Sequence, residues 1–227
     1  MKAFNFLEEY LEEHYPNRAE RLADWWVHAV GLLAAIGGGI ALLVYCLVNG
    51  HPALIAATML YAVCLIAMLA ISAAYNFSRI GPHRPFLRRM DEAAIFLMIA
   101  GSYTPFTTQR LEGAWAVTMT LLVWAIAIFG VFGKLFLTHI SERAWTMVYV
   151  AFGWLAVIAM RPLIEGVAMI SLILLVIGGL LYTMGALLFL RPTLPYRRAV
   201  WHTCVVTAAA AHYAAIFVGV AVAGASA

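Results

Sequence analysis

The sequence predicts an all-α integral membrane protein: a seven-transmembrane helix bundle with its N-terminus in the cytoplasm and its C-terminus outside. Three observations support this class. The 227 residues are 65% hydrophobic and only 11% charged, which is more apolar surface than a soluble domain of this size can cover. Apolar segments close to the roughly 20 residues that a spanning helix needs fill almost the whole chain. Lys and Arg gather in alternate loops.

The seven predicted spans follow one another through short connections that carry Gly, Pro or charged residues. In chain order they cover residues 25–48, 54–76, 91–109, 114–133, 144–160, 165–190 and 199–225. The connections after the first six spans contain Asn49-Gly50-His51-Pro52, Gly81-Pro82, Arg110 to Gly113, Lys134 to Arg143, Arg161-Pro162, and Arg191-Pro192 through Arg198. The expected organisation is therefore a short N-terminal segment, residues 1–24, followed by a membrane domain, residues 25–227.

The distribution of positive charge predicts the orientation. Two of the fourteen Lys and Arg residues, Arg110 and Arg161, fall on the predicted outer side. The other twelve fall on the side of the N-terminus: Lys2, Arg18, Arg21, Arg79, Arg84, Arg88, Arg89, Lys134, Arg143, Arg191, Arg197 and Arg198. Cytoplasmic loops of helical membrane proteins carry such an excess. The net charge of +3 thus indicates topology rather than a nucleic-acid surface, and the expected partner is membrane lipid.

The first fifteen residues form a candidate interfacial helix. Most of their apolar side chains share one helical face, but Glu residues stand between them. An acidic face suits anionic headgroups poorly. We therefore expect this segment to dock on the basic loops of its own chain.

Polar residues at the cytoplasmic span ends are the candidates for chemistry, because such groups are costly within a membrane. Each of four span ends contributes some: Glu20, Asp24 and His28; Ser72 and Asn76; Asp91 and Glu92; Arg198 and His202. Spacings of four residues place side chains on one helical face. The alternative is that they are ordinary helix-end residues, favoured by the helix dipole and by topology. The deeper His212 is either a buried group bonded to a neighbouring span or part of a deeper polar pocket.

At these residues the chain resembles the hemolysin III family, the bacterial branch of the progestin and adiponectin receptor superfamily, which is related to the alkaline ceramidases. The resemblance covers most of the chain. It rests on Glu20-x3-Asp24-x3-His28-x2-Gly31, Ser72-x2-Tyr75, the run from Asp91 through Ala94-Ile95-Phe96-Leu97 to Gly101-Ser102-Tyr103-Thr104-Pro105-Phe106, Gly153-Trp154, Gly178-Gly179-x2-Tyr182-x2-Gly185, and Leu194-Pro195-Tyr196-x4-Trp201-His202-x9-His212. It implies a multi-pass protein of the bacterial inner (cell) membrane.

The resemblance also implies a zinc ion at the cytoplasmic end, held by one His ending span two and two His in span seven, with a Ser and an Asp nearby. This chain keeps Ser72, Asp91 and His202 but has Asn76 and Arg198 at the other two ligand positions. An amide is a poor zinc ligand, and Arg cannot ligate because it stays protonated. We therefore expect no tight zinc and no other cofactor.

If a metal does bind, the donors expected from the sequence are Asp91, Glu92 and His202. Without one, we expect Arg198 to neutralise Asp91 and Glu92 through bidentate pairing, within a polar cluster of His28, Ser72, Asn76, Asp91, Glu92, Arg198 and His202.

Three classes of function remain open at this point. A non-catalytic regulator of membrane state or lipid sensor, with a lipid or fatty acid as ligand, is favoured because the metal ligands are incomplete. A lipid amide hydrolase would need Asp91, Glu92 or His202 as general base, with Ser72 as oxyanion donor or bystander. A cytolysin or a transporter is the third class, the latter because His28, His202 and His212 can line a path.

Overall fold

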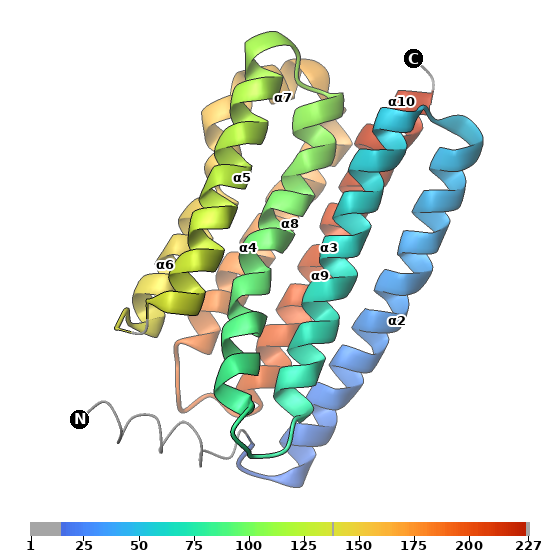
Figure 1. Ribbon diagram of the computed structural model, residues 1–227. Coiled ribbons are helices and arrows are strands. Elements are labelled where there is room, and N and C mark those ends of the chain that lie inside the picture. The colour runs from blue at the N-terminus through green and yellow to red at the C-terminus, as the bar shows by residue number, and fades with distance from the viewer. Residues whose placement is uncertain (1–14, 138, 226–227) are drawn as a thin grey trace.

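A computed structural model gives the fold and describes residues 15–137 and 139–225. All regular structure within these residues is helical (Figure 1). The long helices are α2 (Arg18–Asn49), α3 (Pro52–Phe77), α4 (Arg84–Gln109), α5 (Gly113–Phe136), α8 (Met169–Phe189) and α9 (Arg197–Ile216). Shorter elements are α6 (Glu142–Gly153), the 3₁₀ helix η1 (Leu155–Ala159), α7 (Met160–Gly166), the π-helix η2 (Phe217–Val222) and α10 (Ala223–Ala225).

Six helices of the described part are long and apolar enough to cross a membrane. They are α2, α3, α5, the combined stretch Glu142–Gly166, α8 and the combined stretch Arg197–Ala225. α4 is not among them, because its first turns carry charged residues and its last turns carry polar ones, such as Thr107, Thr108 and Gln109. It nevertheless packs between α3 and α5 along its length. The seven-span count and the orientation therefore stay predictions.

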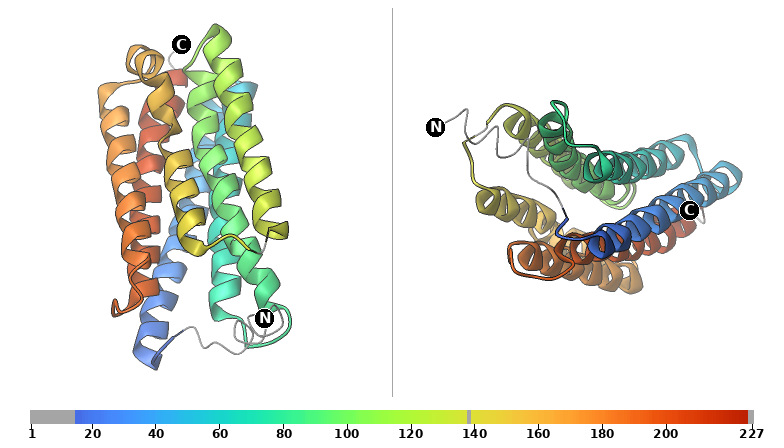
Figure 2. Two further views of the ribbon diagram at one scale, coloured as in Figure 1. Left: turned by 90° about the vertical axis from the view of Figure 1, so that its left-hand side faces the viewer. Right: turned by 90° about the horizontal axis from the view of Figure 1, so that it is seen from below.

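The helices form two layers that meet at one edge and separate at the other (Figure 2). α3, α4 and α5 make one layer, and α2, α9 and α8 make the second. α2 contacts α3 at the closed edge, while α6 bridges the open edge by contacting both α4 and α8. The interior between the layers is where a site can form.

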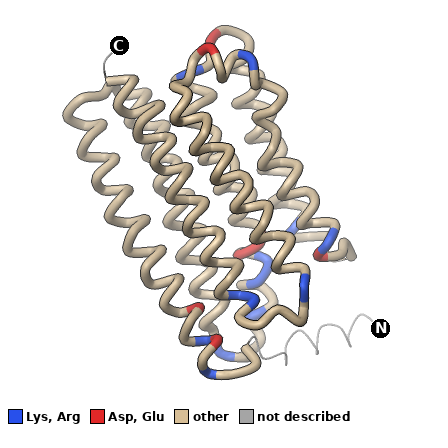
Figure 3. Tube along the Cα trace, turned by 180° about the vertical axis from the view of Figure 1, so that it is seen from behind, with Lys and Arg blue, Asp and Glu red and all other residues tan. Residues whose placement is uncertain are grey.

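Figure 3 shows that the charged residues lie toward the two ends of the bundle. We call the end at which α2 and α4 begin the basic end. At the opposite end are Arg110, the C-cap of α4, and Arg161, in α7. The expected docking of the acidic N-terminal helix concerns residues outside the described part.

The predicted fifth span, residues 144–160, is not one continuous helix. α6 ends at Gly153, η1 follows, and α7 continues to Gly166, so α8 begins at Met169 rather than at residue 165. The Tyr103 hydroxyl of α4 enters this break: it donates to Gly153 O at 2.8 Å and accepts from Ala156 N at 2.7 Å. The change from α-helical to 3₁₀ hydrogen bonding frees backbone groups, which need such partners within the protein if the segment lies in lipid.

Small residues bring α8 and α9 together. The buried positions Ser171, Gly178 and Gly185 repeat every seven residues on α8 and so share one face. A Cβ added at Gly185 would lie 2.6 Å from the Cys204 Cβ of α9, and one at Gly178 would collide with His212. Close backbone approach of this kind is a common way to join membrane helices.

Candidate functional site

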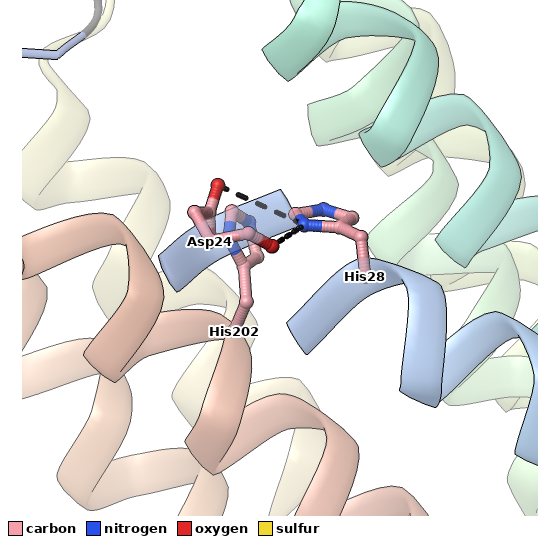
Figure 4. A group of neighbouring side chains, drawn as sticks. All are labelled: Asp24, His28 and His202. Carbon is pink, nitrogen blue, oxygen red and sulfur yellow. Dashed lines mark hydrogen bonds and ion pairs between the residues drawn. The ribbon is translucent and has the colours of Figure 1, made fainter. Parts of the chain in front are cut away.

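Five side chains from three helices form a buried polar cluster near the basic end. α2 contributes Asp24 and His28 one turn apart, α3 contributes Ser72 and Asn76 one turn apart, and α9 contributes His202. All five are buried, and Asp24 is 0% exposed. Figure 4 shows Asp24, His28 and His202 pointing toward one another from α2 and α9.

The two histidines are oriented by Asp24. His202 Nδ1 lies 2.6 Å from the Asp24 Oδ1 atom, and His28 Nδ1 lies 2.9 Å from the Asp24 backbone oxygen. A carboxylate and a carbonyl oxygen only accept hydrogen bonds, so each imidazole donates through Nδ1. The Nε2 atoms of both rings then converge on the Ser72 hydroxyl, at 3.3 Å from His28 and 3.5 Å from His202. A hydroxyl has one hydrogen, so Ser72 can donate to one ring at a time.

Asn76 links this cluster to Arg198. Its Nδ2 donates to Ser72 O at 3.0 Å and to Ser72 Oγ at 3.3 Å. Its Oδ1 accepts from Arg198 Nη1 at 3.2 Å. The guanidinium therefore sits at the edge of the cluster, bound to the residue that replaces a histidine of the family pattern.

Tyr15 closes the cluster from the segment before α2. Its hydroxyl donates to Asp24 Oδ2 at 2.5 Å. Burial, and then the negative charge of Asp24, raise the pKa of the Tyr15 phenol above its ordinary value. The sequence analysis named Asp24 among the polar span-end candidates but left it out of the expected cluster, and it missed Tyr15. The four-residue spacing of Asp24 and His28 was the available signal for Asp24, whereas no spacing connects Tyr15 to it.

Asp91 and Glu92 line a vestibule at the basic end, which adjoins the buried polar cluster at His202. This cavity has a volume of about 300 Å³ and is also lined by Lys134, Arg198 and His202. The Glu92 carboxylate is paired with Lys134 and with Arg88, whose Nε lies at 3.0 Å. The structure thus does not bring Glu92 into the buried polar cluster. Asp91 is half-buried. It hydrogen-bonds the Ser72 side chain of the cluster and lies within electrostatic reach of His202 and Arg198.

The donor chemistry can be compared with the zinc pattern that the resemblance implies. At the three family positions the pattern does not fit, because Arg198 donates to Asn76 where two ligands would stand. A second set, Asp24, His28 and His202, has its donor atoms within 4.8 Å of one another. These residue types do bind zinc. Asp24 already accepts from Tyr15 and His202, whereas the Ser72 hydroxyl can donate to only one of the two Nε2 atoms.

Two narrow apolar cavities continue from the vestibule toward mid-membrane. The first, of about 100 Å³, shares Tyr149, Ala186 and Trp201 with the vestibule. The second, of about 110 Å³, shares Tyr103 and His212 with the first. Backbone of the α6 break, including Gly153 and Trp154, lines both cavities.

His212 is both bonded to a neighbouring span and part of a deeper pocket, the two alternatives that the sequence left open. Its Nε2 lies 3.2 Å from Leu175 O on the neighbouring α8, so it is bonded to another span. It also lines both apolar cavities.

Comparison with known proteins identifies the family of the chain. A sequence model of the family described as "Haemolysin-III related" matches residues 18–213. The chain is 32% identical over 187 residues to "Hemolysin-3" of Bacillus cereus, covering 81% of this chain and 84% of that protein. It is 28% identical over 194 residues to "Hemolysin-3 homolog" of Bacillus subtilis (strain 168), covering 86% and 91%.

A human relative extends the likeness beyond bacteria. "Monocyte to macrophage differentiation factor" of Homo sapiens is 30% identical over 131 residues, which cover 56% of this chain and 52% of that protein. The apolar helices and these matches together indicate a multi-pass membrane protein. The chain belongs to the hemolysin III family.

Proposed function

We propose that this protein is a non-catalytic lipid sensor that regulates the state of the bacterial cell membrane. The observation that carries the proposal is the series of adjoining cavities between the two helix layers. The vestibule offers charged side chains, including Arg197 and Arg198, at one end, and the apolar cavities follow it toward mid-membrane. Such a combination suits a single-chain amphiphile with an anionic headgroup, such as a long-chain fatty acid.

The open edge of the bundle supports access from the bilayer. α6 contacts α4 and α8 sparsely compared with the contacts between α8 and α9. Its broken backbone faces the cavities, and discontinuous helices often form ligand sites in membrane proteins. Binding of an acyl chain there would change the packing of α6, and this conformational change would report the ligand.

The test is saturable binding of a fluorescent long-chain fatty acid to the purified protein in nanodiscs. Ala186 is buried and lines both the vestibule and the first apolar cavity. Ala186→Phe should fill this junction and weaken binding by about tenfold or more. Leu187→Phe is the matched control, because Leu187 is 50% exposed on the outer face of the same helix. Absence of saturable binding, or equal affinity in both variants, would disprove the proposal.

The second candidate is a lipid amide hydrolase that works without zinc. The Asp24–His202–Ser72 series favours it, because a carboxylate orients an imidazole whose second nitrogen faces a hydroxyl. Asp24 would hold His202 in one tautomer, and His202 would take a proton from Ser72 or from water. The test is hydrolysis of a long-chain ceramide after chelation. Turnover that falls at least about a hundredfold in Asp24→Asn would establish this role, and no turnover in the wild type would remove it.

A further inference from the structure

A second polar pocket opens at the basic end, on the opposite side of the buried polar cluster from the vestibule. Its volume is about 470 Å³. The start of α2 and the α3–α4 connection form its wall: Tyr15, Pro16, Asn17, Arg18, Arg21, Asn76, Ser78, Arg79, Ile80 and Arg84. We call it the arginine pocket, after Arg18, Arg21, Arg79 and Arg84.

The wall of this pocket holds four guanidinium groups and no Asp or Glu. The vestibule differs, because Asp91, Glu92 and Glu142 stand among its basic residues, and two of these acids form ion pairs. Within residues 15–137 and 139–225, none of the ion pairs found involves Arg18, Arg21 or Arg79.

The helix ends at the wall add to the positive potential of the pocket. α2 begins at Arg18 and α4 begins at Arg84, which brings the positive ends of two long helices to the wall. The C-terminal end of α3, at Ser78, offsets one of them.

From these observations we propose that the arginine pocket binds a phosphate group. Guanidinium groups match phosphate oxygens through paired hydrogen bonds, and helix N-termini favour the same anions. The phosphate comes either from the headgroup of an anionic phospholipid in the adjoining leaflet or from a soluble phosphate compound. Orientation in the membrane explains why these loops are basic. Orientation alone does not require basic residues to line a pocket. Arg143 and Arg191 belong to loops of the same end, yet they are exposed and line none of the pockets described above.

The pocket adjoins the buried polar cluster directly. Tyr15 lines the pocket and donates to Asp24, while Asn76 lines it and binds both Ser72 and Arg198. A phosphate seated there would therefore lie one side chain away from both Asp24 and Ser72.

The experiment uses the full chain in phosphatidylcholine nanodiscs and has two arms. In one arm, inorganic phosphate is titrated and its binding is followed by calorimetry. In the other, phosphatidic acid is included in the disc and its co-purification with the protein is measured by native mass spectrometry. Arg21→Gln/Arg79→Gln removes two charges from the pocket, and Arg143→Gln/Arg191→Gln removes two exposed charges from other loops of the same end. All four arginines are exposed, so both variants should fold.

We expect the pocket variant to bind phosphate at least about tenfold more weakly, with the control variant unchanged within about twofold. Binding in the phosphatidic acid arm alone assigns a lipid headgroup, and binding in the inorganic phosphate arm alone assigns a soluble compound. The proposal is overturned if neither arm shows binding. It is also overturned if both variants lose binding equally, since net charge alone would then be responsible.

Discussion

At the scale of single residues, Arg198 and Asn76 determine whether the site can hold the zinc ion that the resemblance implies. In the pattern that the resemblance implies, both positions hold metal ligands, whereas here they bind each other at 3.2 Å. A guanidinium brings one positive charge to a place where zinc would bring two. Asp24 and Asp91 are the nearby acids whose charges then depend on protein groups: Tyr15 and His202 for the first, and His202 and Arg198 in its electrostatic surroundings for the second.

Elemental analysis of the protein purified without chelator tests whether Asn76 and Arg198 prevent zinc binding. We expect close to zero zinc per chain in the wild type, because Arg198 cannot ligate and Asn76 ligates poorly. The double variant Asn76→His/Arg198→His restores three imidazoles with His202 and should hold about one equivalent. One equivalent of zinc in the wild type would contradict the expectation that the site binds no zinc, and it would point to Asp24, His28 and His202 as the ligands.

The sequence predicted which residue types meet at the basic end but not their exact partners. His28, Ser72, Asn76 and His202 do lie together, because four-residue spacings on helices fix which side chains share a face. Glu92 does not join them, because Lys134 of α5 lies closer to its carboxylate. Such choices depend on helix rotation and on interhelical distances, which a single sequence does not encode at the level of one side chain.

At the scale of the element, the broken fifth span is the main departure from the prediction. Hydropathy predicted one helix over residues 144–160, because the average apolarity of a segment does not register a change in backbone hydrogen bonding. The break depends on a partner more than fifty residues earlier, the Tyr103 hydroxyl, which serves both Gly153 O and Ala156 N. A helix pattern read locally could not reveal it.

Removing that hydroxyl should destabilise the protein. Tyr103→Phe leaves Gly153 O and Ala156 N without this partner, and a loss of about 1–3 kcal/mol is expected for such groups. Thermal unfolding in detergent, followed by circular dichroism, would show a lower midpoint. Tyr196→Phe is the matched control, since Tyr196 is 43% exposed, and its midpoint should not move. Equal midpoints for Tyr103→Phe and the wild type would mean that the break is stable without the hydroxyl.

At the scale of the whole molecule, composition and charge were sufficient to predict a helical membrane protein. The six apolar helices confirm that class, while α4 shows the limit of hydropathy. The first turns of α4 are too charged to pass as apolar, although the helix lies between α3 and α5 in the bundle. Its neighbours, rather than its composition, place it there.

Orientation can be measured with single cysteines placed in a variant that lacks Cys46, Cys64 and Cys204. We expect a cysteine at Ser141, in the α5–α6 connection, to be protected from a membrane-impermeant thiol reagent in intact cells. A cysteine at Glu112, in the α4–α5 connection, should react. The reverse pattern would invert the proposed topology. Reaction at both positions or at neither would show that α5 does not cross the membrane.

The break in the fifth span also has a consequence for the order of synthesis. α4 precedes α6 in the chain, so the ribosome makes Tyr103 before it makes Gly153 and Ala156. The hydroxyl that completes the unwound turn can therefore already stand in the bilayer when the exposed carbonyl and amide arrive. A chain with these two helices in the opposite order would have to insert unpaired backbone into lipid and wait for its partner.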